Sequence, residues 1–478
     1  MSQITRITRA EFAYWRHSRL AVVAAIALVI IAIVSALTSA SFVSSEAAER
    51  AEHQVEADTA FLSQPARHPH RMVHYGHYVY RVPPPLAVVD PGVDAYTGTS
   101  VFLEGHRQNT ATFAEVRETS SLTRFGLLTP AFSLQVLVPL LLIIVGYGCV
   151  VRERRSGTLL QLLTHGAPPG TILAGKAFAL GSLALLAFLP LAVAAAYAAT
   201  RDGWLPPTLM LMGYALYLAI WTFAIVAISA RAQSARGALV VLLGAWLATV
   251  VAMPRVATEA ATAAVPTPNQ VETDLTVHAE LRALGDSHNA NDPNFQNFRA
   301  QILAQYDVER VEDLPVNFRG LVSYEGEART TEVLNAHAGE QLAAERAQSH
   351  VAGRFGLLSP TVALRRLSMI AAGTDLENHH RFMQAAEAHR FEFVQSLNRL
   401  HIERLSYEDD MRRSDDEAGN RRARVSADNW SLLPEFDFEA PAARDRADRA
   451  LPSAGILLLW FGLACAVLYR SSRRVAVA

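Results

Sequence analysis

The sequence predicts a mainly α-helical, polytopic membrane protein with six transmembrane helices and a largely helical extracytoplasmic domain. The chain of 478 residues is 51% hydrophobic and only 18% charged, which is a low charged share for a soluble protein. The charges are also segregated: some apolar stretches carry almost none, and the rest of the chain is rich in Arg, Glu, Asp and His. Such segregation is typical of a chain that alternates between lipid and water.

Six apolar runs reach or nearly reach the length of about 17–25 residues that a membrane-spanning helix needs. We expect spans at 20–42, 131–151, 172–199, 208–230, 237–253 and 451–469. The first run is longer than the roughly 7–15 apolar residues of a signal peptide, which favours an uncleaved helix. Neighbouring helices make Pro139 and Pro190 tolerable inside their spans. Pro254 and Arg255 are expected to end the fifth span.

The basic residues next to the spans predict the orientation of the chain. They form four clusters: Arg6, Arg9, Arg16 and Arg19; Arg152, Arg154, Arg155 and Lys176; Arg231 and Arg236; and Arg470, Arg473 and Arg474. With six spans all four clusters fall on one side, which must be the cytoplasm because basic loops stay inside. We therefore expect a multi-pass protein of the bacterial inner membrane with both termini in the cytoplasm.

This topology divides the chain into five parts. They are the cytoplasmic N-terminus with the first span (1–42), a first extracytoplasmic segment (43–123), spans two to five with a cytoplasmic loop at 151–171 (124–256), a large extracytoplasmic helical domain (257–450), and the sixth span with a cytoplasmic tail (451–478). We expect the two extracytoplasmic segments to pack together.

Local signals place several helix ends in the outer segments. Asp292 and Ser359 each precede a proline, the pattern of an N-cap followed by the first helical turn, and Gly373 is a plausible helix stop. Apolar residues at helical spacing predict a long amphipathic helix over 375–405. The heptapeptide RFGLLTP at 124–130 recurs as RFGLLSP at 354–360, each time before an expected helix start.

The loop between the second and third spans carries the most informative motif. Charged residues are followed by a glycine, a short helix with a leucine face, and a turn containing Pro168, Pro169 and Gly170. A helix lying across such a loop is able to dock in a cleft of a soluble partner and carry its motion to the spans. The alternative is a basic anchor that only sets topology.

This loop resembles the cytoplasmic loop of ABC-2 type transporter permeases. The matching positions include Glu153, Arg154, Gly157, Thr158, Leu159, Leu162, Leu163, Gly175 and Lys176. The chain as a whole is similar to one subfamily of these permeases that has a large extracytoplasmic domain of unassigned function. Further marks of this likeness are His74-Tyr75-Gly76, Asp90-Pro91-Gly92-Val93, Leu103-Glu104-Gly105-His106, Leu314-Pro315-Val316-Asn317 and Ala372-Gly373-Thr374-Asp375. The resemblance implies a permease that works with a separate ABC ATPase subunit and a second permease, as a homodimer or heterodimer.

We therefore expect an ATPase-coupling loop formed by Arg152, Glu153, Arg154, Gly157, Thr158, Leu159, Leu162 and Leu163. Gly170, Gly175 and Lys176 match a phosphate-binding loop in spacing only, because Ala177 stands where that loop needs Ser or Thr. ATP hydrolysis is thus expected in a partner chain, and this chain is expected to transport rather than catalyse. The first alternative is a membrane-anchored extracytoplasmic interaction or sensing module without transport, and the second is an intramembrane enzyme.

The sequence predicts no catalytic residue, cofactor or resident metal. His68, His70, His74 and His77 form a local cluster of imidazoles, which suit zinc or copper. Only His74 and His77 have a spacing that one helical turn would use, and the segment does not look helical, so ordinary surface histidines are the favoured interpretation. The net charge of −2 indicates no nucleic-acid partner, and Cys149 and Cys465 lie in apolar runs that favour core packing.

Overall fold

The computed structural model describes residues 2–112, 128–415 and 417–475. Among these residues, six helices are long and apolar enough to cross a membrane: Arg19–Leu62, Pro130–Arg155, Pro169–Asp202, Leu205–Arg231, Ala235–Ala264 and Ala443–Val475. The predicted helical membrane protein is therefore confirmed at this level. Residues 113–123, the end of the first expected outer segment, and most of the first heptapeptide copy lie outside the described residues.

The N-terminal part of the chain forms two helices that meet at Ser18. Helix α1 (Gln3–His17) packs along α10, and α2 (Arg19–Leu62) follows after Ser18, whose side chain accepts a hydrogen bond from the Ala21 N–H. At about 1.5 Å per residue, α2 is roughly twice as long as the hydrocarbon core of a bilayer is thick. The expected first span and the charged stretch after it are therefore one continuous helix.

Two of the long helices contain a π-helical segment that ends two positions before a proline. In the second span α6 (Pro130–Phe132) and α7 (Val138–Gly146) flank η3 (Ser133–Leu137), and Pro139 follows. In the fifth, α12 (Ala235–Trp246) and α13 (Met253–Ala264) flank η4 (Leu247–Ala252), and Pro254 follows.

The expectation that Pro254 ends the fifth span was wrong, since the helix continues to Ala264. Proline lacks an N–H and its ring clashes with the carbonyl one turn earlier, so it normally breaks the regular ladder of helical hydrogen bonds. The π-segment changes that ladder shortly before the proline, and the helix passes through.

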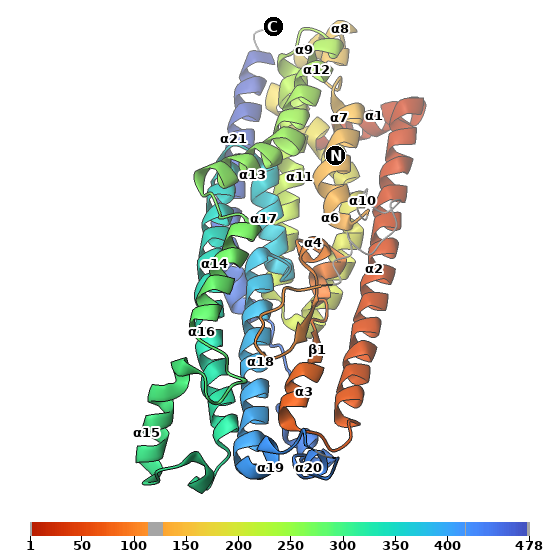
Figure 1. Cartoon of the computed structure of the whole chain (residues 1–478). Coiled ribbons are helices and arrows are strands. Elements are labelled where there is room, and N and C mark those ends of the chain that lie inside the picture. The colour runs from red at the N-terminus through yellow and green to blue at the C-terminus, as the bar shows by residue number, and fades with distance from the viewer. Residues whose placement is uncertain (1, 113–127, 416, 476–478) are drawn as a thin grey trace.

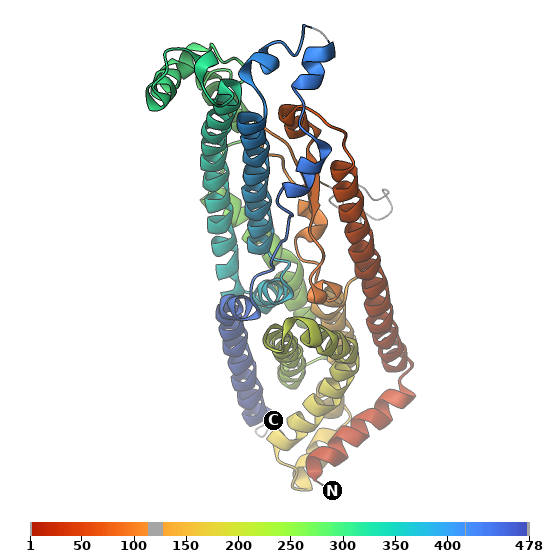
Figure 2. The same cartoon turned by 90° about the horizontal axis from the view of Figure 1, so that it is seen from below.

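The third and fourth membrane helices follow each other after a short turn, whereas the sixth comes after the second outer segment. Helices α8 (Val151–Arg155) and α9 (Thr158–Thr164) join the second span to α10 (Pro169–Asp202), which is followed by α11 (Leu205–Arg231). Helix α21 (Ala443–Val475) completes the bundle and packs against α11. Both termini lie at the end of the bundle that carries α8 and α9 (Figure 2).

Residues 43–112 and 265–442 contribute a second region, here called the polar domain, at the opposite end of the molecule (Figure 1). Its first segment holds α3 (Pro69–Tyr75), η1 (Pro85–Val88), α4 (Asp94–Thr97) and an antiparallel pair, β1 (His77–Tyr80) with β2 (Ser100–Leu103), in which His77 pairs with Leu103. Its second segment is helical and comprises α14 (Gln270–Ala283), η5 (Pro293–Phe295), α15 (Gln296–Tyr306), η6 (Val311–Asp313), α16 (Phe318–Arg354), η7 (Phe355–Leu357), α17 (Pro360–Ala372), α18 (Leu376–Arg404), α19 (Tyr407–Met411), α20 (Glu417–Arg422) and η8 (Ala427–Leu432).

The predicted helix signals of the second segment are confirmed. Asp292 and Ser359 accept hydrogen bonds from backbone N–H groups at the starts of η5 and α17, and Gly373 ends α17 with a positive φ of 75°. Helix α18 covers the expected long helix. The two segments of the polar domain do pack together, since α3 lies on α18 and Phe61, Met72 and Val394 share one buried cluster.

Helix α17 belongs to the second segment in sequence but lies within the bundle, apart from the rest of the polar domain, and so joins the two regions. It packs against α11 and α21, and Leu364 and Leu367 are fully buried there. The Tyr214 hydroxyl lies 3.0 Å from the Ser368 hydroxyl, and the Tyr217 hydroxyl lies 3.0 Å from that of Thr361. Since α17 leads directly into α18, a shift of the bundle would be carried into the polar domain through continuous packing.

Candidate functional site

The connection between the second and third spans has the predicted plan of charges, glycine, short helix and proline turn. Gly157 separates α8 from α9 with φ +76°, and no atom lies within 4 Å of a Cβ built on it. The glycine is therefore required by backbone conformation and not by lack of space. Gly166 adopts φ +80° after α9, and Pro168 then precedes the first turn of α10.

The leucine face of α9 points mostly into the bundle. Leu159 is only 5% exposed, and Leu162 and Leu163 are half-buried against the same core. Leu160, by contrast, is 64% exposed. The face expected to contact a partner thus packs against this chain, and the leucine of α9 that is left exposed is Leu160.

Four charged residues meet below this loop, and we call them the coupling cluster: Glu11 on α1, Arg152 and Glu153 on α8, and Lys176 on α10. The Lys176 ammonium lies 2.5 Å from Glu11 Oε2 and is also paired with Glu153. Arg152 Nη2 lies 3.0 Å from both carboxylate oxygens of Glu11. Two acids and two bases therefore neutralise one another.

The coupling cluster is buried, so each of its charges needs a partner of opposite sign. The side chains of Lys176 and Glu11 are each 1% exposed, and Glu153 is 15% exposed. Removing charges from water is unfavourable, so loss of one member of such a group leaves its partner buried and unpaired. The cluster joins the loop to the first helix of the chain and to the start of the third span, so these three elements should move as one body.

Arg154 also makes contacts within the chain. Its guanidinium donates hydrogen bonds to the carbonyl oxygens of Ala230 at 2.5 Å and Ala232 at 2.8 Å, at the C-terminal end of α11. A cation at this position satisfies carbonyls that have no helical partner. Glu153 and Arg154 were expected to offer charges to a partner, but both are engaged internally. Arg155, which is exposed, is the basic side chain of α8 that faces outward.

The glycine–lysine motif at 170–176 lies on helix α10 and not on a loop. A Cβ on Gly175 would lie 2.6 Å from Ile7 Cγ2, so this glycine allows α1 to approach closely. Thr8 donates a hydrogen bond to the Gly175 carbonyl at 3.0 Å. The Lys176 ammonium is enclosed by carboxylates, an arrangement opposite to the phosphate cradle that the spacing imitates.

Two residues of this region, Glu11 of α1 and Leu160 of the loop, were not singled out in the sequence. Glu11 contributes the deepest carboxylate, and its signal was an isolated acid in an N-terminal helix that otherwise carries arginines. Leu160 was not singled out because the sequence does not show which of the neighbouring leucines stays exposed when α9 packs against the bundle. Thr158 begins α9, and its hydroxyl lies 2.8 Å from that of Ser156.

The four histidines of 68–77 separate into different surroundings. His68 accepts the His70 N–H at 3.1 Å and its Nε2 lies 3.1 Å from Asp410, while His77 pairs with Asp58 at 2.9 Å. The expectation of a non-helical segment was wrong, because His68 caps α3 and Pro69 occupies its first turn. His70 and His74 therefore face the same side one helical turn apart.

Comparison with known proteins gives one match. Residues 270–439 match the family model described as "Domain of unknown function (DUF3526)", which covers less than half of the chain. No curated protein and no solved structure matches the chain. The matched residues fall in the second segment of the polar domain and do not include the coupling cluster.

Proposed function

We propose that this chain is the membrane-spanning permease subunit of an ABC transporter of the ABC-2 type. It couples ATP hydrolysis in a separate ATPase subunit to translocation of a substrate or to movement of its extracytoplasmic domain. The observation that carries the proposal is the docked α8–α9 loop with its coupling cluster. The loop presents Leu160 and Arg155 outward and is tied internally to α1 and α10.

The fold offers a route for the coupled movement. Force applied at α9 reaches α10 through Lys176 and the end of α11 through Arg154. Helix α11 in turn holds α17 by two buried hydroxyl pairs, and α17 continues into α18 of the polar domain. In this proposal the bundle transmits the ATPase cycle to the far end of the molecule, and a second permease of the same kind completes the transporter.

The proposal requires the polar domain to lie on the outer side of the bacterial inner membrane and both termini to lie on its cytoplasmic side. Thr59 on α2 and Glu332 on α16 are exposed, and so is Gln161 on α9. In a cysteine-free background, cysteines at Thr59 and Glu332 should react with an impermeant reagent in intact cells, and a cysteine at Gln161 should react only after lysis. The reverse pattern would overturn the orientation.

Identification of the partner tests the function itself. The full chain, purified in mild detergent from its own host, should retain an ABC ATPase whose hydrolysis depends on the presence of the chain. Recovery of the chain with no ATPase, together with normal function in cells that lack every candidate ATPase, would overturn the proposal.

A cavity favours one second candidate, a membrane-anchored sensing or interaction module without transport. It has a volume of about 410 Å³, within the range of small-molecule sites, and lies where the polar domain meets the bundle. Arg50, Arg81 and Arg446 line it, but each is paired with a carboxylate of this chain. Asp202 and Asp437 line it as well, so the lining offers a ligand polar groups of both signs. Ligand responses that persist without ATP hydrolysis would favour this candidate over the permease.

A further inference from the structure

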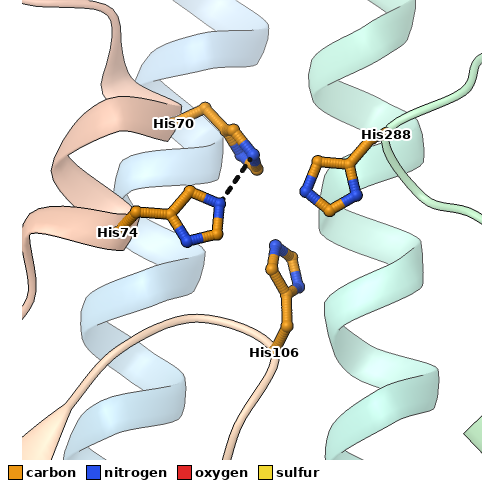
Figure 3. Close-up of side chains that lie close together, drawn as sticks. All are labelled: His70, His74, His106 and His288. Carbon is orange, nitrogen blue, oxygen red and sulfur yellow. Dashed lines mark hydrogen bonds between the residues drawn. The ribbon is translucent and has the colours of Figure 1, made fainter.

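Four histidines from three separate segments of the polar domain converge on one point (Figure 3). His70 and His74 lie on α3, His106 follows β2, and His288 lies in the turn between α14 and η5. We call this group the histidine site. Both segments of the polar domain contribute, so the site exists only when the domain is folded.

The spacing of the ring nitrogens fits a single metal ion. One nitrogen from each ring lies within 4.8 Å of the others, and His70 Nε2 is 3.2 Å from His74 Nε2. Zinc–nitrogen bonds of about 2.0–2.1 Å place the nitrogens of a tetrahedral site about 3.3 Å apart. His74 and His288 are exposed, so small side-chain rotations bring the wider pairs to that distance.

Hydrogen bonds at the far side of two rings turn their other nitrogens inward. His106 Nδ1 lies 2.9 Å from Glu327 Oε2, and His288 Nδ1 lies 3.0 Å from Asp286 Oδ1. A ring that donates through Nδ1 to a carboxylate presents a bare Nε2, which is the arrangement that orients metal-binding histidines. His106 Nε2 is buried and has no hydrogen-bond partner in the described part of the chain.

The two rings on α3 lie in surroundings that lower their pKa. Burial, together with the neighbouring His106, His288 and His74, lowers the pKa of His70 to about 2. Burial, together with His106 and His288, also lowers the pKa of His74, whereas Glu104 and Glu327 act to raise it. The geometry of the site is thus four convergent rings with a carboxylate behind two of them.

A nearby group of His68, His401 and Asp410 differs from the histidine site because its side chains are paired with one another. His401 Nε2 lies 2.8 Å from Asp410 Oδ2, and His68 lies 3.1 Å from Oδ1 of the same carboxylate. Arg413 also pairs with Asp410 at 3.0 Å. Every charge there has a partner, and a guanidinium already occupies the side where a cation would bind.

We propose that His70, His74, His106 and His288 form a binding site for one divalent transition-metal ion of the class that prefers imidazole, such as Zn²⁺ or Cu²⁺. The bound ion ties the α14–η5 turn to α3 and to the loop after β2. This inference does not depend on the permease function, because it rests on the polar domain alone.

The test is metal titration of the full chain in detergent after removal of metals with a chelator. Calorimetry with ZnCl₂ and, separately, CuCl₂ should show saturable binding of one equivalent, and elemental analysis after dialysis should confirm the ratio. CaCl₂ should not bind there, because calcium prefers oxygen ligands. Tighter binding of Zn²⁺ or of Cu²⁺ identifies the preferred ion, and either result supports the proposal.

Variants separate the site from general effects. His106→Ala and His288→Ala should each weaken binding at least tenfold, and Asp286→Asn, which removes the carboxylate behind His288, should weaken it about tenfold. His278→Ala, an exposed histidine on α14 outside the site, serves as the matched control and should bind normally. His288 is itself exposed, so its variant should fold, and circular dichroism verifies this.

Two results would overturn the proposal. One is the absence of saturable binding of both Zn²⁺ and Cu²⁺ to folded wild-type protein. The other is binding that His106→Ala and His288→Ala leave unchanged, which would place the ion elsewhere on the chain.

Discussion

The coupling cluster and the histidine site are both groups of polar side chains assembled from distant parts of the chain, yet they differ in how their charges are balanced. In the coupling cluster, Lys176 and Arg152 neutralise Glu11 and Glu153. In the histidine site, four rings of one chemical type face each other and the carboxylates stand behind them. The charges of the coupling cluster pair with one another and hold helices α1, α8 and α10 together. The ring nitrogens of the histidine site converge without a group of opposite character between them, so we expect a ligand to bind there.

The largest expected effect follows from breaking the balance of the coupling cluster. Lys176→Met leaves Glu11 and Glu153 buried without their shared cation, and loss of one partner of a buried pair typically costs about 3–5 kcal/mol. We expect the free energy of unfolding in detergent to fall by this amount. The double variant Glu11→Gln with Lys176→Met removes one charge of each sign and should recover most of the loss. Equal instability of both variants would show that charge balance is not what the cluster provides.

A second effect concerns the pH dependence of the polar domain. Burial lowers the pKa of His389 from its ordinary 6.5 to about 4, and the neighbouring His77 acts in the same direction. The unfolded chain therefore binds the proton more readily between these values, so stability is retained above the upper value and falls as pH is lowered. His68 and His379, whose pKa values are also lowered to about 4 by burial, act in the same sense.

Replacing His389 by Gln should reduce the loss of stability on going from about pH 7.5 to about pH 4.5 by about 2 kcal/mol. Hydrogen exchange of the α18 amides at the two pH values measures this difference. His53→Gln, at a histidine whose side chain is 55% exposed, is the control and should not change the slope. An unchanged slope in His389→Gln would contradict the assignment of the proton to this side chain.

A smaller effect should follow from crowding the contact between α1 and α10. Gly175→Ala would place a methyl group 2.6 Å from Ile7 Cγ2 and displace the helix that carries Glu11. Overpacking of this kind typically costs about 1–3 kcal/mol. Gly170→Ala, in the same motif, has no atom within 4 Å of the new methyl group and should be neutral or slightly stabilising. Thermal unfolding distinguishes the two, and equal midpoints would mean that α1 does not depend on this contact.

The smallest effect on stability is expected at Leu160. Because its side chain is 64% exposed, Leu160→Ala should change the free energy of unfolding by no more than about 0.5 kcal/mol. Leu159→Ala removes a side chain that is 5% exposed and should cost about 2–5 kcal/mol. Similar losses at the two positions would show that α9 is not docked on the bundle as described.

Local patterns in the sequence were sufficient for the membrane helices and their caps. Long uncharged runs located all six candidate spans, although the helices that hold the first, fifth and sixth extend well beyond the predicted bounds. Ser359 with Pro360 marked the start of α17. The continuation of the fifth helix through Pro254 was not predictable, since the π-segment that accommodates the proline has no distinct residue pattern. The start of α3 was marked by the N-cap His68 and by Pro69 in its first turn. This pattern was overlooked because the histidines of the segment were considered only for their spacing.

Contacts between distant residues were beyond local patterns in both sites. Glu11 and Lys176 are 165 positions apart in the sequence, and no local pattern around either residue indicates that they form a pair. The sequence grouped His70 and His74 with His68 and His77, which lie next to them in the chain, whereas the structure groups them with His106 and His288. Burial and register decide such groupings, and both arise only when the helices pack.

We propose above all that the ATPase subunit docks on α9. A substitution of Leu160 tests this docking most directly. The measurement is the affinity of the purified full chain for its ATPase subunit, with Leu160→Ala compared with Leu37→Ala, whose side chain is similarly exposed at 66% but lies on the α2 membrane helix. Apolar anchors carry most of the energy of an interface, so Leu160→Ala should weaken association at least tenfold and Leu37→Ala should leave it unchanged. Equal affinity of the ATPase for both variants would contradict the account and leave α8 and α9 as a topological anchor.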